Sequence, residues 1–125
     1  MPTTIITSHN QRIASVTLAS VIATGQDILD LLMTTSVDTD CDRIALPATA
    51  FPDDFFVLST GLAGELLQKC VNYRFKIAIY GDYSQYTSVP LQAFIRESNR
   101  GNSVFFPATL EEAVEMLAQG YSQPT

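Results

Sequence analysis

The spacing of apolar residues over positions 55–80 predicts the centre of the fold. Between residues 61 and 73 the apolar side chains recur every three or four positions, as on the buried face of an amphipathic helix; they are Leu62, Ala63, Leu66, Leu67, Cys70 and Val71. Residues 76–80 then form a short apolar run typical of a central strand. Ser59 and Thr60 precede the helix, where a hydroxyl oxygen can accept a bond from a first-turn amide. We therefore expect a capped turn, a helix and a strand.

A hairpin and a first helix are predicted ahead of this unit. Residues 3–7 and 12–18 are rich in β-branched side chains on either side of a polar turn, which is typical of two antiparallel strands. Thr24 and Asp27 have the spacing of a capping box. They predict a helix over residues 25–36, followed by an acidic loop.

Further elements follow the same alternation of strand and helix patterns. A strand is predicted over residues 43–46 and a short helical turn over 52–58. The next helix is capped by Ser88 and ends at Gly101, which is expected in the left-handed conformation, and a strand over 103–106 follows. The last helix begins with a capping box of Thr109 and Glu112 and ends at Gly120. The order is ββαβαβαβα in a single domain. It predicts the α/β class, with a mixed five-stranded sheet whose first strand is antiparallel.

The alternation within the strands predicts how the sheet is covered. One face would carry the larger apolar residues and the other smaller or more polar ones. Consecutive right-handed crossovers place their helices on one face, so we expect helices mainly on that face and a second face only partly covered. We also expect a homodimer formed through the sparse face or the sheet edge, with Ile13, Tyr80 and Phe105 as its apolar members.

Composition narrows the classes of function. The chain has 125 residues, of which 46% are hydrophobic and 16% charged, so it is expected to fold as a globular domain. A net charge of −6 argues against nucleic-acid binding. No apolar run approaches the roughly 20 residues of a membrane span, and no signal segment opens the chain. Two cysteines without metal-ligand spacing predict a reduced cytoplasmic protein with no metal and no cofactor.

No catalytic set assembles from the sequence. Asp38, Asp40 and Asp42 alternate like the start of a calcium loop, but the glycine and later glutamate of that signature are missing. His9 falls in the hairpin turn, and Cys70 falls on the apolar stripe. The glycines of residues 60–64 lack the lysine of a phosphate-binding loop, so they are expected to allow close helix packing.

Polar residues gather on two of the predicted helices. They are Glu65, Gln68, Lys69, Asn72, Tyr73 and Arg74 on the first, with Glu97, Ser98 and Asn99 on the second. Several of these side chains form two or more hydrogen bonds at once. Two interpretations stay open, a solvated helix face and a surface for a protein partner.

Several motifs resemble a known family. Residues 60–65, 68–69, 72–74, 78–82 and 94–99 resemble the bacterial domain of unknown function 4180, over nearly the whole chain. More distantly, residues 58–62 and 104–113 are similar to the STAS domains of anti-sigma-factor antagonists. That resemblance implies a STAS-like fold in which a partner kinase phosphorylates a hydroxyl, and Thr60 matches its position. Leu58 stands where the STAS turn has an aspartate.

Three hypotheses of function follow. The first is a regulatory module that binds a protein partner around Ser59, Thr60 and Gly61. The second is a module that binds a small molecule or nucleotide at the same helix amino terminus, which favours anions. The third, ranked last, is an enzyme that uses Glu65 or Glu97.

Overall fold

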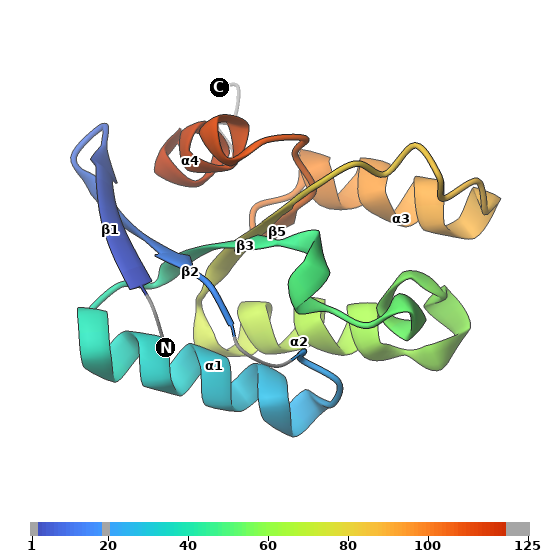
Figure 1. The fold of residues 1–125 in the computed structure, drawn as a ribbon, viewed down its shortest axis with the longest axis horizontal. Helices are drawn as coiled ribbons and strands as arrows, with labels where there is room; N and C mark the ends of the chain where they lie inside the picture. The colour runs from blue at the N-terminus through green and yellow to red at the C-terminus, as the bar shows by residue number, and fades with distance from the viewer. Residues whose placement is uncertain (1–2, 19–20, 120–125) are drawn as a thin grey trace.

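Five strands form one mixed sheet whose neighbours follow the order of the chain (Figure 1). β1 (Thr3–Ser8) and β2 (Gln11–Val16) form the antiparallel hairpin. β3 (Arg43–Pro47), β4 (Lys76–Tyr80) and β5 (Val104–Phe105) then run parallel to β2. This structure is a computed structural model that describes residues 3–18 and 21–119. The α/β class, the order of elements and the antiparallel first strand are confirmed.

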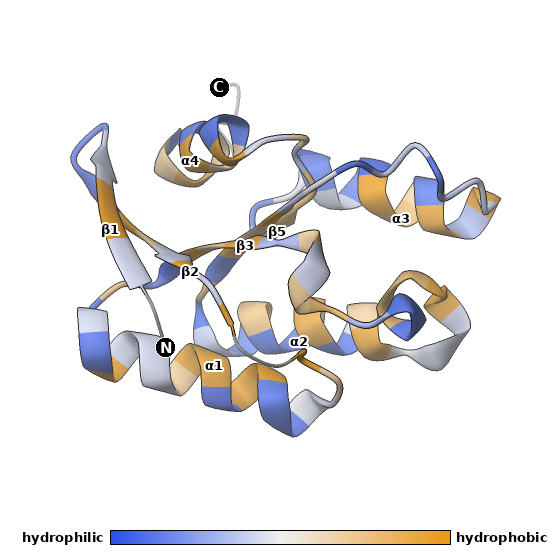
Figure 2. Ribbon diagram, in the orientation of Figure 1, coloured by the Kyte–Doolittle hydropathy of each residue, from blue (hydrophilic) through white to orange (hydrophobic). Residues whose placement is uncertain are grey.

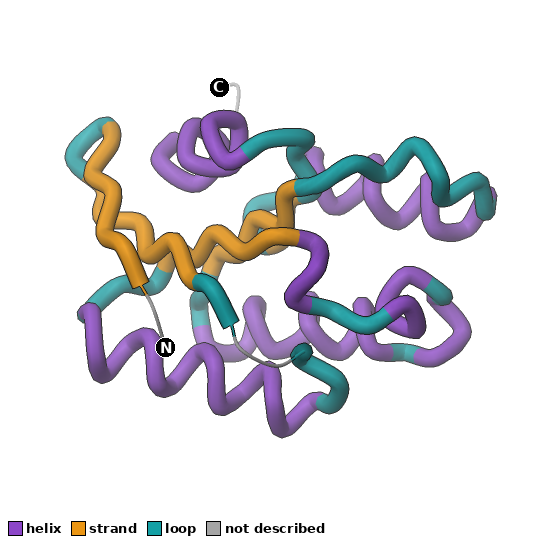
Figure 3. Tube along the Cα trace, viewed as in Figure 1, coloured by secondary structure: helices purple, strands orange, loops and turns teal. Residues whose placement is uncertain are grey.

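Helices connect the parallel strands and close the described chain (Figure 3). They are α1 (Gly25–Thr39), α2 (Leu62–Tyr73), α3 (Val89–Arg100) and α4 (Leu110–Gln119). Three short 3-10 turns, Ala48–Ala50, Asp53–Phe56 and Leu58–Thr60, lie between β3 and α2. Each helix carries apolar and polar residues around its circumference (Figure 2), as the periodicity predicted.

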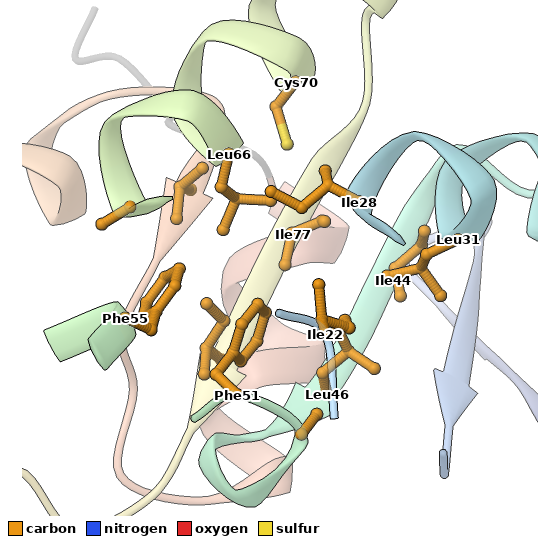
Figure 4. Packing of buried hydrophobic residues seen from close by; sticks show 14 of the residues in the cluster. Ile22, Ile28, Leu31, Ile44, Leu46, Phe51, Phe55, Leu66, Cys70 and Ile77 are labelled. Carbon is orange, nitrogen blue, oxygen red and sulfur yellow. The ribbon is translucent and has the colours of Figure 1, made fainter. Parts of the chain in front are cut away.

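The main core lies between the sheet and the helices α1 and α2 (Figure 4). Ile44 and Ile77 of the sheet and Leu66 of α2 are all fully buried there. Leu91 of α3 belongs to the same cluster, so three helices contribute to this face. The larger apolar residues of the strands face this core, as predicted from their alternation.

The second face of the sheet is covered by α4, which lies on the opposite side from α1 and α2 (Figure 1). Ile13 and Phe105 are 0% and 2% exposed, and they pack with Leu117 of α4. The Arg43 guanidinium donates a hydrogen bond to the Leu117 carbonyl, at the helix end that favours a cation. Three of the four described helices contribute to the main-core face, as predicted, whereas α4 covers the second face more fully than expected, because α4 leads into no further strand among the described residues and the handedness rule does not place it. Of the three residues expected to form a dimer, Ile13 and Phe105 are buried within one chain, and Tyr80 is partly exposed.

The helix ends show where local signals were sufficient. The Thr24 hydroxyl accepts the amide of Asp27 at 3.1 Å, and Ser88 caps α3, as predicted. α1 continues to Thr39, beyond the predicted end, because Asp40 adopts the left-handed conformation (φ 57°) that ends it. Gly101 is extended rather than left-handed, since α3 ends on a bond from its amide to the Ser98 carbonyl. The predicted end at Gly120 lies outside the described residues.

Candidate functional site

The turn that leads into α2 differs from the predicted cap. Gly61 occupies the cap position with φ 84°, and within the described chain no side chain caps the helix there. The Thr60 hydroxyl instead donates to the carbonyls of Asp54 (2.8 Å) and Val57 (2.9 Å). Because the left-handed Gly61 is the residue that precedes α2, Thr60 belongs to the 3-10 turn Leu58–Thr60 and not to the helix cap. Ser59 and Thr60 are both exposed, so the turn presents hydroxyl side chains on the surface.

Loss of the Thr60 hydroxyl is expected to weaken this turn. Thr60→Ala should lower the free energy of unfolding by about 1 kcal/mol, because the hydroxyl bond shared between the Asp54 and Val57 carbonyls is lost, although each carbonyl keeps its backbone amide donor. Thr60→Ser should be close to wild type, and Ser59→Ala serves as the neighbouring control. Urea unfolding measures all three. A Thr60→Ser variant as unstable as Thr60→Ala would show that the hydroxyl bonds contribute nothing.

The two glycines beside this turn have different roles. A Cβ atom added at Gly61 or at Gly64 would meet nothing within 4 Å, so neither allows close helix packing, and that interpretation is wrong. Gly61 is required for its left-handed backbone, whereas Gly64 lies within a helix, where alanine is favoured. We expect Gly64→Ala to stabilise the protein by about 1 kcal/mol and Gly61→Ala to destabilise it by about 1–2 kcal/mol. Thermal melts that shift in the same direction for both variants would contradict this assignment.

The polar residues predicted on α2 are largely engaged within the helix. Glu65 lies 3.5 Å from Lys69, and Gln68 donates to Asn72 at 3.0 Å. The Glu65 carboxylate also lies against the start of α1, because a Cβ at Gly25 would come within 2.8 Å of both its oxygens. These contacts support the interpretation of a solvated helix face.

The residues predicted to form a site on α2 are spread along the whole helix. Its 12 residues span about 18 Å at the usual rise of a helix, so Thr60 and Arg74 lie at opposite ends of it. Tyr73 is half exposed, and Arg74 ends the helix in the left-handed conformation (φ 63°). The predicted residues therefore do not form one compact site.

The three candidates on α3 have structural partners. Ser98 is buried, and the Asn99 side-chain oxygen accepts the amide of Phe106 at 2.7 Å. Glu97 lies 3.7 Å from Arg100 on the exposed side of the helix. Glu65 and Glu97 thus each have a basic partner on their own helix, which does not favour paired carboxylates acting on a substrate.

A pocket that the sequence did not indicate opens at the carboxyl end of the parallel strands. β3 and β4 end side by side at Pro47 and Tyr80, and the chain leaves them into the turns at 48–60 and the loop at 81–88. The pocket has a volume of about 490 Å³ and is lined by Pro47, Ala48, Thr49, Phe51, Asp53, Phe56, Tyr80, Gly81, Asp82, Gln85 and Tyr86. Ligands of open α/β sheets bind outside the carboxyl ends of the strands, although the order of the described strands does not reverse beside this pocket. We call it the carboxyl-end pocket.

Aromatic packing holds the two walls of the carboxyl-end pocket together. The rings of Phe56 and Tyr86 are stacked, with centroids 4.6 Å apart and planes at 23°. The Tyr83 hydroxyl donates to the Ile79 carbonyl and fixes the loop to the end of β4. A Cβ at Gly81 would lie 2.8 Å from that of Ala48, so only glycine permits this approach of the two segments. The walls are therefore preorganised by contacts within the chain.

The charges around the carboxyl-end pocket have one sign. Among its described lining residues, Asp53 and Asp82 are charged and none is basic. Hydrogen bonds from the side chain and the amide of Ser84, the latter 2.9 Å long, lower the pKa of Asp82. Asp82 is therefore ionised at neutral pH. The pocket combines aromatic faces with carboxylates.

Cys70 and His9, the nucleophile and the base considered from the sequence, do not line the carboxyl-end pocket. His9 is exposed in the hairpin turn, 3.2 Å from Glu115 of α4. Cys70 is fully buried, and burial raises the pKa of its thiol to about 12. In the part of the chain that the structure describes, no three His, Cys, Asp or Glu side chains gather where a metal ion could be held.

Alkaline pH is expected to destabilise the protein through Cys70 and Tyr83. Burial raises the pKa of both groups, and interaction with Tyr86 adds to the effect at Tyr83. A raised pKa in the folded state gives stability that is complete below the unfolded pKa, about 8.5 for cysteine, and lost as pH rises above it. Thermal melts between pH 8 and 11, as approximate limits, should fall less steeply for Cys70→Ala and for Tyr83→Phe than for wild type. If the melting temperature of the variants fell with pH as steeply as that of wild type, ionisation of Cys70 and Tyr83 would not be the cause of the alkaline loss of stability.

The sheet order and the pocket define a small α/β domain with a preformed pocket at the carboxyl edge of its sheet. The chain belongs to the family described as Domain of unknown function (DUF4180), whose family model matches residues 8–117. This confirms the first resemblance, whereas a relationship to STAS domains is not shown. Comparison with curated proteins found no match, and comparison with solved structures found none. Within residues 3–18 and 21–119, no helix combines the length and apolar character needed to cross a bilayer.

Proposed function

We propose that this protein is a non-catalytic module that recognises another protein through the carboxyl-end pocket and the exposed turn beside it. The observation that carries the proposal is the pocket itself, an open concave site of about 490 Å³ between two segments that aromatic stacking holds together. Preformed concave sites of this size are where proteins bind ligands. The proposal moves the recognition site from the outer faces of α2 and α3 to the end of the sheet.

The surface around the carboxyl-end pocket favours a protein partner. Asp53 and Phe56 line the pocket, and the chain continues from them to the exposed turn that contains Ser59 and Thr60. Val57 is 50% exposed in the same segment. These exposed side chains extend the surface around the pocket, where a protein partner would make further contacts. This surface supports the first hypothesis from the sequence.

The second hypothesis, a nucleotide or other anion at the amino terminus of α2, ranks lower. The first turn of α2 carries Glu65, and the earlier 3-10 turn Asp53–Phe56 carries Asp53 and Asp54. These carboxylates oppose an anion that the helix dipole would attract. A phosphate on Thr60 would also remove the donor to the Asp54 and Val57 carbonyls. Phosphorylation would therefore rearrange this turn rather than leave it unchanged.

Site-specific photocrosslinking in the native host tests where partners bind. A photoreactive residue at Gln85, which lines the carboxyl-end pocket, should give a defined crosslinked product. The matched control is Gln68, also an exposed glutamine but on the outer face of α2. Mass spectrometry identifies the product and separates another protein from a second copy of this chain. Crosslinking from Gln68 and none from Gln85 would contradict the proposal.

A further inference from the structure

We infer that the carboxyl-end pocket accepts the basic side chain of a lysine or arginine presented by the partner protein. The inference rests on the proposed function and specifies the chemistry of its site. It rests on three properties of the pocket: the sign of its charges, the nature of its walls and its contrast with a neighbouring pocket.

The carboxylates come from both walls of the pocket. Asp53 follows β3 in the 3-10 turn Asp53–Phe56, and Asp82 follows β4 in the adjacent loop. The described residues that line the pocket include no lysine, arginine or histidine to neutralise them. A cation between the two walls would interact with both carboxylates, and the net charge of −6 adds attraction at longer range.

The aromatic rings suit the same occupant. Tyr80 and Tyr86 are partly exposed in the lining, and Phe56, which is 5% exposed, supports the Tyr86 ring by stacking at 4.6 Å. Aromatic faces attract ammonium and guanidinium groups, and they also pack against the methylene stem of a long basic side chain. A carboxylate or phosphate in the same place would meet two like charges and no basic partner among the described lining residues.

A second pocket on the other side of Tyr86 has the opposite charge. It has a volume of about 470 Å³, and its lining includes Arg96 and Arg100 of α3. A cation would be repelled there, although Tyr86 belongs to both pockets. The sign of the charge therefore directs a basic side chain to the carboxyl-end pocket.

A titration with three short peptides tests the inference. The probes are acetyl-Gly-Arg-Gly-amide, its lysine analogue and its citrulline analogue, which is neutral and nearly the same shape as arginine. Nuclear magnetic resonance titration at millimolar concentration should show that the arginine and lysine peptides shift the amide signals of Gly81, Asp82 and Gln85. The citrulline peptide should not. Equal shifts with citrulline, or no shift with any peptide, would overturn the inference.

Charge-removing variants locate the effect. The double substitution Asp53→Asn and Asp82→Asn should weaken binding of the arginine peptide by about tenfold or more, since both carboxylates are lost. Asp38→Asn is the control, because it removes an exposed carboxylate at the end of α1, before the amino end of β3, whereas the pocket lies at the carboxyl end of that strand; affinity should stay within about twofold. Circular dichroism checks that each variant is folded. An effect of Asp38→Asn as large as that of Asp82→Asn alone would overturn the assignment to this pocket.

Two outcomes separate this inference from the proposed function. If Gln85 crosslinks to a partner equally well in the wild type and in the Asp53→Asn, Asp82→Asn protein, the pocket recognises a partner but not through a basic side chain. If the peptides bind and Gln85 gives no crosslink, the proposed function fails instead. Ethylguanidinium is the final probe, and binding tighter than that of the arginine peptide would indicate that the ligand is a free amine or guanidine and would overturn the inference of a partner side chain.

Discussion

Replacing Leu66 with alanine is expected to lower the free energy of unfolding by about 2–5 kcal/mol. Leu66 is 0% exposed at the centre of α2, and its side chain packs into the main core between α2 and the sheet (Figure 4). Alanine would leave a cavity that fixed strands on one side and α1 on the other cannot close. Urea unfolding followed by circular dichroism measures the loss.

Val71→Ala is the matched control for Leu66→Ala. The apolar spacing placed both residues on one stripe, but Val71 is 56% exposed in the structure. Its truncation should change stability by less than about 1 kcal/mol. Equal losses for Leu66→Ala and Val71→Ala would mean that the buried face of α2 is wider than described. A small loss for Leu66→Ala would mean that this face is turned differently.

The second large effect is expected at Leu117, on the other side of the sheet. Leu117→Ala should also cost about 2–5 kcal/mol, because this fully buried side chain holds α4 against Ile13 and Phe105. Hydrogen exchange of the α4 amides should become faster than in wild type, since the helix loses its main apolar contact. Met116→Ala, at a partly buried neighbouring position, should have a smaller effect.

The Leu117→Ala result also decides between the two descriptions of the second face. A loss of stability together with faster exchange in α4 supports a face covered within one chain. A near-neutral result would mean that α4 does not hold this face. In that case the sparse surface expected from the sequence would be available again for self-association, and light scattering would show a mass above that of one chain.

The strand order and the main core could be predicted because they depend on local periodicity. Apolar residues at alternate positions assign Ile44 and Ile77 to one face and Ala45 and Ala78 to the other, whatever the rest of the chain does. The cap at Thr24 was predicted for the same reason, since its partner lies three residues away. Local patterns of this kind fix an element before its neighbours are known.

Two errors arose where the sequence allowed more than one conformation. A threonine before a helix either accepts a bond from the first turn or donates one to the preceding carbonyls, and Thr60 does the second. The face that α4 covers is not set by a crossover, because the helix follows the last described strand. The role of Thr60 depends on the left-handed Gly61 that follows it, and the position of α4 depends on contacts such as the hydrogen bond from Arg43 to Leu117.

The carboxyl-end pocket could not be predicted from local patterns. Asp53 and Asp82 are far apart in the sequence, and each resembles an ordinary acid in a surface turn. They come together because the parallel register places Pro47 beside Tyr80, so both following segments begin at the same point of the sheet. The tendency of open α/β sheets to bind ligands at the carboxyl ends of their strands points to this edge but not to this pair of strands, because the order of the described strands does not reverse there.

Hydrogen exchange of the protein with and without its crosslinked partner tests the central claim most directly. Recognition at the carboxyl-end pocket predicts slower exchange in the turns at 48–56 and the loop at 81–86 when the partner is bound. The outer faces of α2 and α3, including Gln68 and Arg96, should exchange at the same rate in both states. Protection confined to residues 68–74 and 96–100, with none at 48–56 or 81–86, would contradict the claim.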